Sequence, residues 1–273
     1  MNVLLIGLSI LWMAAASVTD IRKKEVSDWL SFSLFAIGLF FLITRAITEK
    51  SYELLIPALI IFVIFLIIAN LLYYLGLFGG GDAKLLIALS PILPQLTFQS
   101  IFSLPSALTF ILNCLLIGSI YGMIYGIVLA FKHKNQFKEN LSKLRFPILP
   151  FLILSLAVAV VSFFTYQFLL IFAAIILLFP LLFIFTKAVE NVALIKTIET
   201  SKLTEGDWLA QPVKVGSRII NAKSGLTAKE IEFLKKHKNH VTIKEGIPFV
   251  PVFLIAFILS LLLGNLLELF ILA

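Results

Sequence analysis

Cysteine and charged residues are scarce in this sequence of 273 residues. Cys114 is the single cysteine, so no internal disulfide can form and a disulfide-stapled scaffold is excluded. Charged residues make up 14% of the chain, against about 25% in soluble domains, and 60% of the residues are hydrophobic. So little charge cannot cover a water-soluble fold, and we expect a membrane protein in which Cys114 is a small core residue.

Long uncharged runs predict an all-α polytopic membrane protein, because about 20 apolar residues in a helix cross the hydrocarbon layer. We expect about eight transmembrane helices, at residues 2–19, 29–44, 54–78, 85–96, 106–131, 147–164, 168–186 and 247–272. The run 85–96 is too short to span, which predicts a stunted helix buried among its neighbours. The stretch 146–186 has no charge and is too long for one helix, so we expect a hairpin that turns at residues 165–167.

Basic residues orient the chain, because loops rich in lysine and arginine stay in the cytoplasm. Three of them follow the first helix at residues 22–24, and five lie in the loop 132–145. Both loops are therefore expected to be cytoplasmic. Counting crossings then places the N-terminus outside and residues 79–84 on the same cytoplasmic side as 22–24. A small-residue tract at 14–17 resembles a signal-peptide cleavage site, but no base precedes it and we expect the first helix to be retained.

The charge pattern divides the chain into three parts. Residues 1–186 are expected to form the transmembrane core, residues 187–246 a small cytoplasmic α+β insertion, and residues 247–273 a C-terminal transmembrane helix. In the insertion, Thr227 and Glu230 have the spacing of a capping box, which predicts a short helix to about His237.

Other residues of the insertion indicate strands and a solvated surface. Alternation at 213–215 and 241–244 indicates two short strands. His237 and His240 lack a third ligand nearby, so we expect solvated side chains and no metal.

Acidic residues at the ends of apolar runs are the informative ones, because charge is costly near lipid and tends to mark function. They are Asp20, Asp28, Asp82 and Glu268. Asp20 and Asp82 both lie at cytoplasmic helix ends, so helix packing can bring them together. Asp82 follows three glycines, Gly79, Gly80 and Gly81, which permit backbone conformations and close approaches that a side chain would forbid.

Two interpretations of the segment 79–82 stay open at this point. It can be an ordinary loop in which Asp82 caps the next helix. Alternatively, Asp20 and Asp82 form a pair that shares one proton and hydrolyses a peptide bond. In such a pair the ionised carboxylate takes a proton from water and the protonated one binds the scissile carbonyl.

Several segments together resemble the prepilin and preflagellin peptidases, intramembrane aspartyl proteases of the glycine-x-glycine-aspartate type. The segments 20–30 and 79–86 are similar to the two aspartate segments of that family. The segment 146–152 resembles its proline-phenylalanine motif, though without the usual glycine, and 206–251 resembles the C-terminal extension of archaeal members.

The resemblance implies that this chain removes short, usually basic leaders from membrane-inserted pilin-like or archaellin precursors. The site would lie on the cytoplasmic face of the plasma membrane and use no cofactor. Asp20 and Asp82 would be the catalytic pair and Asp28 a cap of the second helix. Lys84 would either reach the lipid headgroups or tune the pair through its charge. Methylation, which bacterial members perform, is not expected because no cysteine pair is present to bind zinc.

Other functions remain open alternatives. An ion-coupled transporter could use the same carboxylates near a broken helix, although no repeat of hydropathy between two halves is evident. A non-catalytic membrane scaffold would need neither aspartate. Glu205 and Asp207 can be solvated or can contact a basic leader peptide. Glycines at 118, 122 and 126 recur on one helix face, which indicates close helix packing or a substrate groove.

Overall fold

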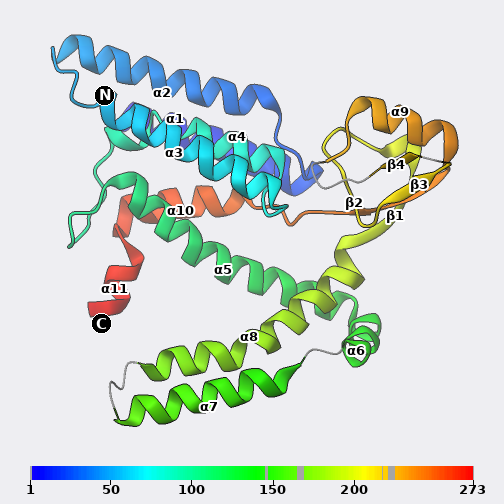
Figure 1. Ribbon diagram of the computed structural model, residues 1–273. Helices are drawn as coiled ribbons and strands as arrows, with labels where there is room; N and C mark the ends of the chain where they lie inside the picture. The colour runs from blue at the N-terminus through cyan, green and yellow to red at the C-terminus, as the bar shows by residue number, and fades with distance from the viewer. Residues whose placement is uncertain (1, 145–146, 165–168, 217, 221–224, 273) are drawn as a thin grey trace. The chain divides into compact units, whose positions relative to one another are not determined.

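The computed structural model describes residues 2–144, 147–164, 169–216, 218–220 and 225–272 (Figure 1). Its helices are α1 (Asn2–Lys23), α2 (Asp28–Thr48), α3 (Leu55–Tyr74), α4 (Gly80–Ala88), α5 (Ser106–Lys132), α6 (Lys134–Lys143), α7 (Ile148–Phe164), α8 (Leu169–Val189), α9 (Ala228–His237), α10 (Val250–Leu263) and α11 (Leu266–Leu272). Its strands are β1 (Ile195–Glu199), β2 (Trp208–Leu209), β3 (Val213–Val215), β4 (Arg218–Ile220) and β5 (His240–Lys244). Short 3-10 or π-helical turns occupy Leu93–Gln95, Glu190–Leu194 and Thr200–Lys202.

The chain forms two compact units, Met1–Gly122 with Ile198–Ala273, and Met123–Thr197. Five helical segments among the described residues are long and apolar enough to cross a membrane: Val3–Lys23, Asp28–Thr48, Leu55–Tyr74, Ser106–Lys132 and Ile176–Leu194. Large apolar side chains on them are exposed, as lipid contact requires. The chain is therefore a mostly helical, multi-pass membrane protein with a small sheet region, and the number of eight spans stays a prediction.

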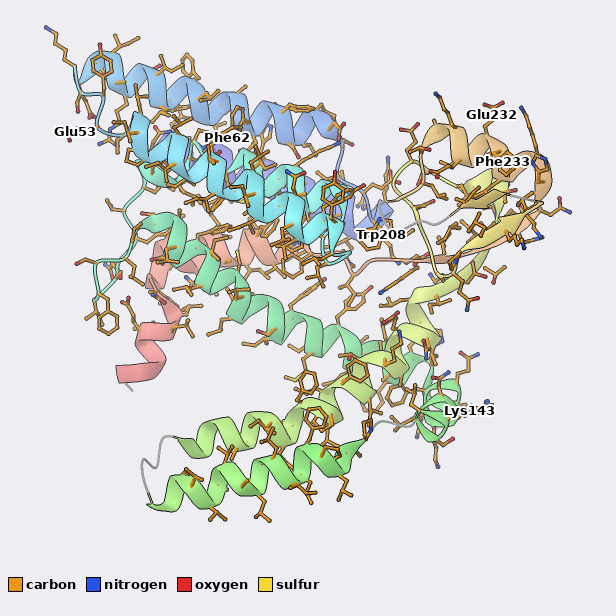
Figure 2. The ribbon with its side chains drawn as sticks, in the orientation of Figure 1. Glu53, Phe62, Lys143, Trp208, Glu232 and Phe233 are labelled. Carbon is orange, nitrogen blue, oxygen red and sulfur yellow. The ribbon has the colours of Figure 1, made fainter. Side chains whose placement is uncertain are left out.

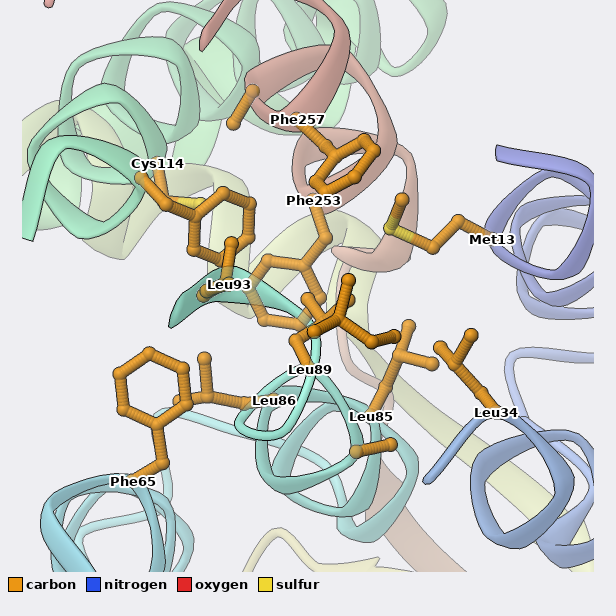
Figure 3. Packing of buried hydrophobic residues seen from close by; sticks show 14 of the residues in the cluster. Met13, Leu34, Phe65, Leu85, Leu86, Leu89, Leu93, Cys114, Phe253 and Phe257 are labelled. Carbon is orange, nitrogen blue, oxygen red and sulfur yellow. The ribbon is translucent and has the colours of Figure 1, made fainter. Parts of the chain in front are cut away.

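The short helix α4 lies at the centre of the first unit. It packs against α2 and α3, while α1 packs against α2 and α10. Leu85, Leu86 and Leu89 are buried in one cluster with Phe65 of α3 and Phe253 of α10 (Figure 3). This confirms the prediction of a stunted helix buried among its neighbours, although α4 begins earlier than the apolar run and ends before Pro91. Cys114 is buried in the same cluster, as predicted.

The end of the chain differs from the single helix predicted over 247–272. The structure has two helices there, α10 and α11, separated at Gly264. Gly264 has a φ of +73°, and a Cβ atom at this position would lie 2.0 Å from the Gln99 carbonyl oxygen. The Asn113 side chain donates to the Gly264 carbonyl at 2.8 Å and accepts from the Leu266 N–H at 3.0 Å. Asn113 thus satisfies the backbone groups that the break releases.

The described residues of the first unit between 198 and 246 have their own small core. A sheet has the strand order β1-β5-β2, and β3 and β4 form an antiparallel pair. The capping box is confirmed, since Glu230 accepts from the Thr227 N–H at 2.9 Å and α9 ends at His237. The two predicted strands are confirmed as β3 and β5. Helix α8 continues to Val189, beyond the predicted start of the insertion at 187.

The second unit contains the two apolar helices α7 and α8, which pack against each other. The Ser155 hydroxyl donates to the Ala173 carbonyl at 2.8 Å, and the rings of Phe151 and Phe179 stack at 5.6 Å. These two helices agree with the predicted hairpin, while its turn at 165–167 lies outside the described residues.

Candidate active site

Asp20 lies in the last turns of α1 and is buried, with 6% of its surface exposed. Its Oδ2 atom accepts a hydrogen bond of 3.0 Å from the backbone N–H of Val250, at the start of α10. The chain leaves α1 at Lys24, where φ is +56° and the N–H donates to the Asp20 carbonyl at 2.7 Å. This left-handed turn ends the helix one turn after the aspartate.

Asp82 lies in the first turn of α4, which Gly79 precedes as the N-cap. The Gly79 N–H donates to Asp82 Oδ2 at 3.0 Å, so the carboxylate caps its own helix, as the first of the two interpretations expects. Of the three glycines, Gly81 makes the closest approach, because a Cβ atom there would lie 2.9 Å from Val26 Cβ. At Gly80 the nearest atom to such a Cβ is 3.9 Å away, on Tyr73. Position 81 therefore requires a glycine, whereas position 80 has room for a Cβ atom.

The segments that carry the two aspartates are in direct contact. Val26 follows Asp20 by a few residues and packs on Gly81, and the Lys84 ammonium bonds to Asp28 Oδ1 at 2.5 Å. Asp28 is thus the first residue of α2 and an ion-pair partner, whereas the preceding Ser27 is the N-cap and makes no side-chain cap bond.

Asp82 interacts electrostatically with Asp20. Asp82 lies outside the five membrane-spanning segments, and it is partly buried. Burial and, to a smaller extent, the negative charge of Asp20 together raise the pKa of Asp82 to about 7, while the Gly79 N–H opposes both effects. The two carboxyls that the sequence singled out therefore lie within electrostatic reach of each other.

The described residues between 198 and 246 contact the first aspartate segment and the end of α3, which precedes the second. Lys24 forms an ion pair with Glu245, and the Thr204 hydroxyl donates to Glu25 at 3.0 Å. Trp208 of β2 extends toward the end of α3 (Figure 2), where a Cβ atom on Gly76 would lie 2.6 Å from its ring. Sequence reasoning did not find this contact, because nothing in the sequence pairs a tryptophan with a distant glycine.

The other candidate residues lie in ordinary surroundings. Asp207 accepts from the Thr204 N–H at 2.8 Å, and burial, with smaller contributions from Glu25 and Glu245, raises the pKa of its carboxyl. Glu205 is exposed. His237 and His240 are exposed as well, and no group of three His, Cys, Asp or Glu residues able to hold a metal comes together in the described part of the chain.

The glycine and proline motifs have different outcomes. A Cβ atom at Gly118 would lie 2.9 Å from the Phe249 ring, whereas Gly122 has open space around it, so close packing holds at one of these positions and not the next.

The segment 146–152 begins at a residue outside the described ones and continues into α7. Another tract with proline and phenylalanine, Pro248 to Pro251, lies beside Asp20. Its prolines are the sequence signal that could have identified this segment as part of the site.

Comparison with known proteins locates the likeness in the first part of the chain. A model of the type IV leader peptidase family matches residues 7–127. The chain is 36% identical over 85 residues to a preflagellin peptidase of Methanococcus maripaludis, which covers 31% of this chain and 36% of that protein. It is 28% identical over 98 residues to a preflagellin peptidase of Methanococcus voltae, which covers 36% of this chain and 42% of that protein.

The match spans less than half the length of these curated relatives. The family match over residues 7–127 nevertheless includes Asp20, Asp82 and the motif glycines Gly79, Gly80 and Gly81. Residues 7–127 of this chain thus match the type IV leader peptidase family, which supports the resemblance drawn from the two aspartate segments.

Proposed function

We propose that this protein is an intramembrane aspartyl endopeptidase that removes short N-terminal leaders from pilin-like or archaellin precursors. The observation that carries the proposal is the contact between the two aspartate segments, in which Val26 packs on Gly81 and Asp20 lies within electrostatic reach of Asp82. The family match of residues 7–127 and the preflagellin peptidases among its relatives support leader cleavage in particular.

The proposed mechanism uses the two carboxyls in different protonation states. Asp82, whose pKa is raised to about 7, holds a proton and donates it in a hydrogen bond to the scissile carbonyl oxygen. Asp20, ionised, takes a proton from a water molecule whose oxygen attacks the carbonyl carbon. The tetrahedral intermediate collapses when the leaving nitrogen receives the proton that Asp20 took from water. The C–N bond then breaks, the new carboxyl and amino termini leave, and Asp20 is ionised again while Asp82 keeps its proton.

The site is proposed to face the cytoplasm. Arg22 and Lys23 lie in the last turn of α1, beside Asp20, and basic residues favour the cytoplasmic side. This orientation puts the N-terminus outside. Water reaches a site at such an interface more readily than one at the centre of the bilayer, and the precursor's apolar helix would enter from the lipid.

The test is cleavage of a candidate precursor by the full-length protein in liposomes, with the new N-terminus located by mass spectrometry. Asp20→Asn and Asp82→Asn are each expected to abolish cleavage. Asp28→Asn is the matched control, since this carboxylate is nearby but pairs with Lys84. Trimming by the double variant Asp20→Asn, Asp82→Asn would refute the proposal. If the double variant loses ion uptake into the same liposomes while it still cleaves the precursor, the transporter is favoured instead.

A further inference from the structure

The start of helix α10 supplies the hydrogen bonds that Asp20 receives. The Val250 N–H donates to Asp20 Oδ2 at 3.0 Å, and the Phe249 amide also interacts with this carboxylate. Val250 is fully buried, so water does not compete for its N–H. The next residue, Pro251, has no N–H group. The free amides at this helix end are therefore directed to one acceptor.

From this geometry we infer that the first turn of α10 is a positioning element of the active site, which holds Asp20 ionised and correctly oriented. The inference rests on the proposed function and extends it to a segment outside residues 7–127, the stretch that matches the family. Backbone N–H groups at a helix N-terminus favour a negative charge, because each donates to the ionised form and the helix dipole adds to their effect.

Packing fixes this turn against both aspartate segments. The Phe249 ring lies 5.3 Å from that of Phe78, directly before the motif glycines, and also contacts Gly118. Phe253, one turn further along α10, lies 5.9 Å from the same Phe78 ring. The turn that bonds to Asp20 therefore also contacts the loop that leads to Asp82, and a shift of α10 would disturb both acids.

The far end of α10 is anchored as well. Asn113 of α5 donates to the Ser260 hydroxyl at 2.8 Å, and the Asn265 N–H donates to the Gln99 carbonyl at 3.0 Å. In α11 the buried Glu268 carboxylate accepts from the Ser100 hydroxyl at 2.7 Å. These bonds prevent α10 from sliding along its axis. The amides of its first turn are consequently preorganised for Asp20 before any substrate binds.

The charged groups that act on Asp20 come from two other elements. Lys24 lies in the loop after α1, and Asp82 lies on α4. Both act on the Asp20 carboxylate through their charge, whereas Val250 donates a backbone hydrogen bond to it. Removal of the Val250 N–H is therefore expected to change the titration of Asp20 while both neighbouring charges stay in place.

The test replaces the backbone N–H of Val250 by an ester oxygen in the full-length protein, through incorporation of the α-hydroxy acid analogue of valine. The side chain is unchanged. The matched control is the same replacement at Val252, which is equally buried and whose N–H bonds to the Phe249 carbonyl at 2.9 Å instead of to a carboxylate. Val250→Ala, which keeps the N–H, is a second control.

The ester at position 250 is expected to lower kcat for precursor cleavage by about 10- to 100-fold, the range for a hydrogen bond to a charged group. The acid side of the pH–rate profile is expected to move up by about one to two pH units. The ester at position 252 and Val250→Ala are expected to leave the profile where it is. A merely structural role would lower stability without moving the profile.

Infrared titration gives a second readout that needs no activity. The band of protonated Asp20, assigned by difference from Asp20→Asn, is expected to persist to higher pH in the Val250 ester. Equal titrations and equal pH profiles for the 250 and 252 esters would overturn the inference. Cleavage that survives Asp20→Asn would instead overturn the proposed function, whether or not the infrared band has moved.

Discussion

A methyl group added at Gly81 tests how closely the two aspartate segments must approach. A Cβ atom there would lie 2.9 Å from Val26 Cβ, 3.1 Å from its Cγ2 and 3.2 Å from its backbone nitrogen. Val26 is 8% exposed and β-branched, so its side chain has little freedom to rotate away. The two segments must therefore separate. Overpacking of this kind costs about 1–3 kcal/mol, and a misplacement of about 1 Å in a catalytic group can lower the rate by about 100-fold.

Gly80→Ala is the matched control for Gly81→Ala. Its Cβ would have ordinary contact with Tyr73 at 3.9 Å, and alanine favours a helix more than glycine by about 1 kcal/mol. Initial rates of precursor cleavage and thermal unfolding in detergent are measured for both variants. Gly80→Ala is expected to keep wild-type activity and Gly81→Ala to lose most of it.

A rescue experiment separates contact with Val26 from other causes. Val26→Ala shortens the side chain that the new methyl group would meet, so the double variant Gly81→Ala, Val26→Ala is expected to recover part of the lost rate. Wild-type activity in Gly81→Ala, or equal losses at positions 80 and 81, would refute the reasoning.

Three further predictions follow from individual contacts. Because burial and Asp20 raise the pKa of Asp82 to about 7, and the mechanism needs this acid protonated, kcat/KM is expected to fall as the pH rises through about 7; a rate that keeps rising well above that pH would contradict this. Lys84→Ala breaks an exposed pair with Asp28, so unfolding in detergent is expected to change by less than about 1 kcal/mol and the pH profile to stay unchanged; a displaced profile would show that Lys84 tunes the pair. Glu268→Gln turns an NH₂ group toward donors such as the Ile101 N–H and is expected to lower the free energy of unfolding by about 1–3 kcal/mol, measured by chemical denaturation.

Local sequence chemistry predicted much of this molecule. The capping box at Thr227 and Glu230 needs only residues three apart, and it forms as expected. The stunted helix α4 follows from an apolar run too short to span the bilayer. The choice of Asp20 and Asp82 rests on the scarcity of acids at the ends of apolar runs, and the structure brings these two carboxyls within electrostatic reach.

Features that depend on tertiary contact could not be predicted in this way. The break at Gly264 exists because the Gln99 backbone lies against it and Asn113 satisfies the released groups. The donor to Asp20 is a backbone N–H, which every residue except proline carries, so no side-chain pattern marks Val250. Lys84 illustrates the same limit, because its distance in sequence from Asp82 is short while its bonded partner is Asp28.

The most direct test of the central claim is infrared titration of the Asp82 carboxyl with and without the charge of Asp20. In the otherwise unchanged protein, Asp82 is expected to titrate near pH 7, since its pKa is raised to about 7 by burial and by Asp20. In Asp20→Asn the like charge is absent, and the midpoint for Asp82 is expected to move to lower pH. A midpoint that is the same in both proteins would show that the two acids do not sense each other, and would contradict a shared active site.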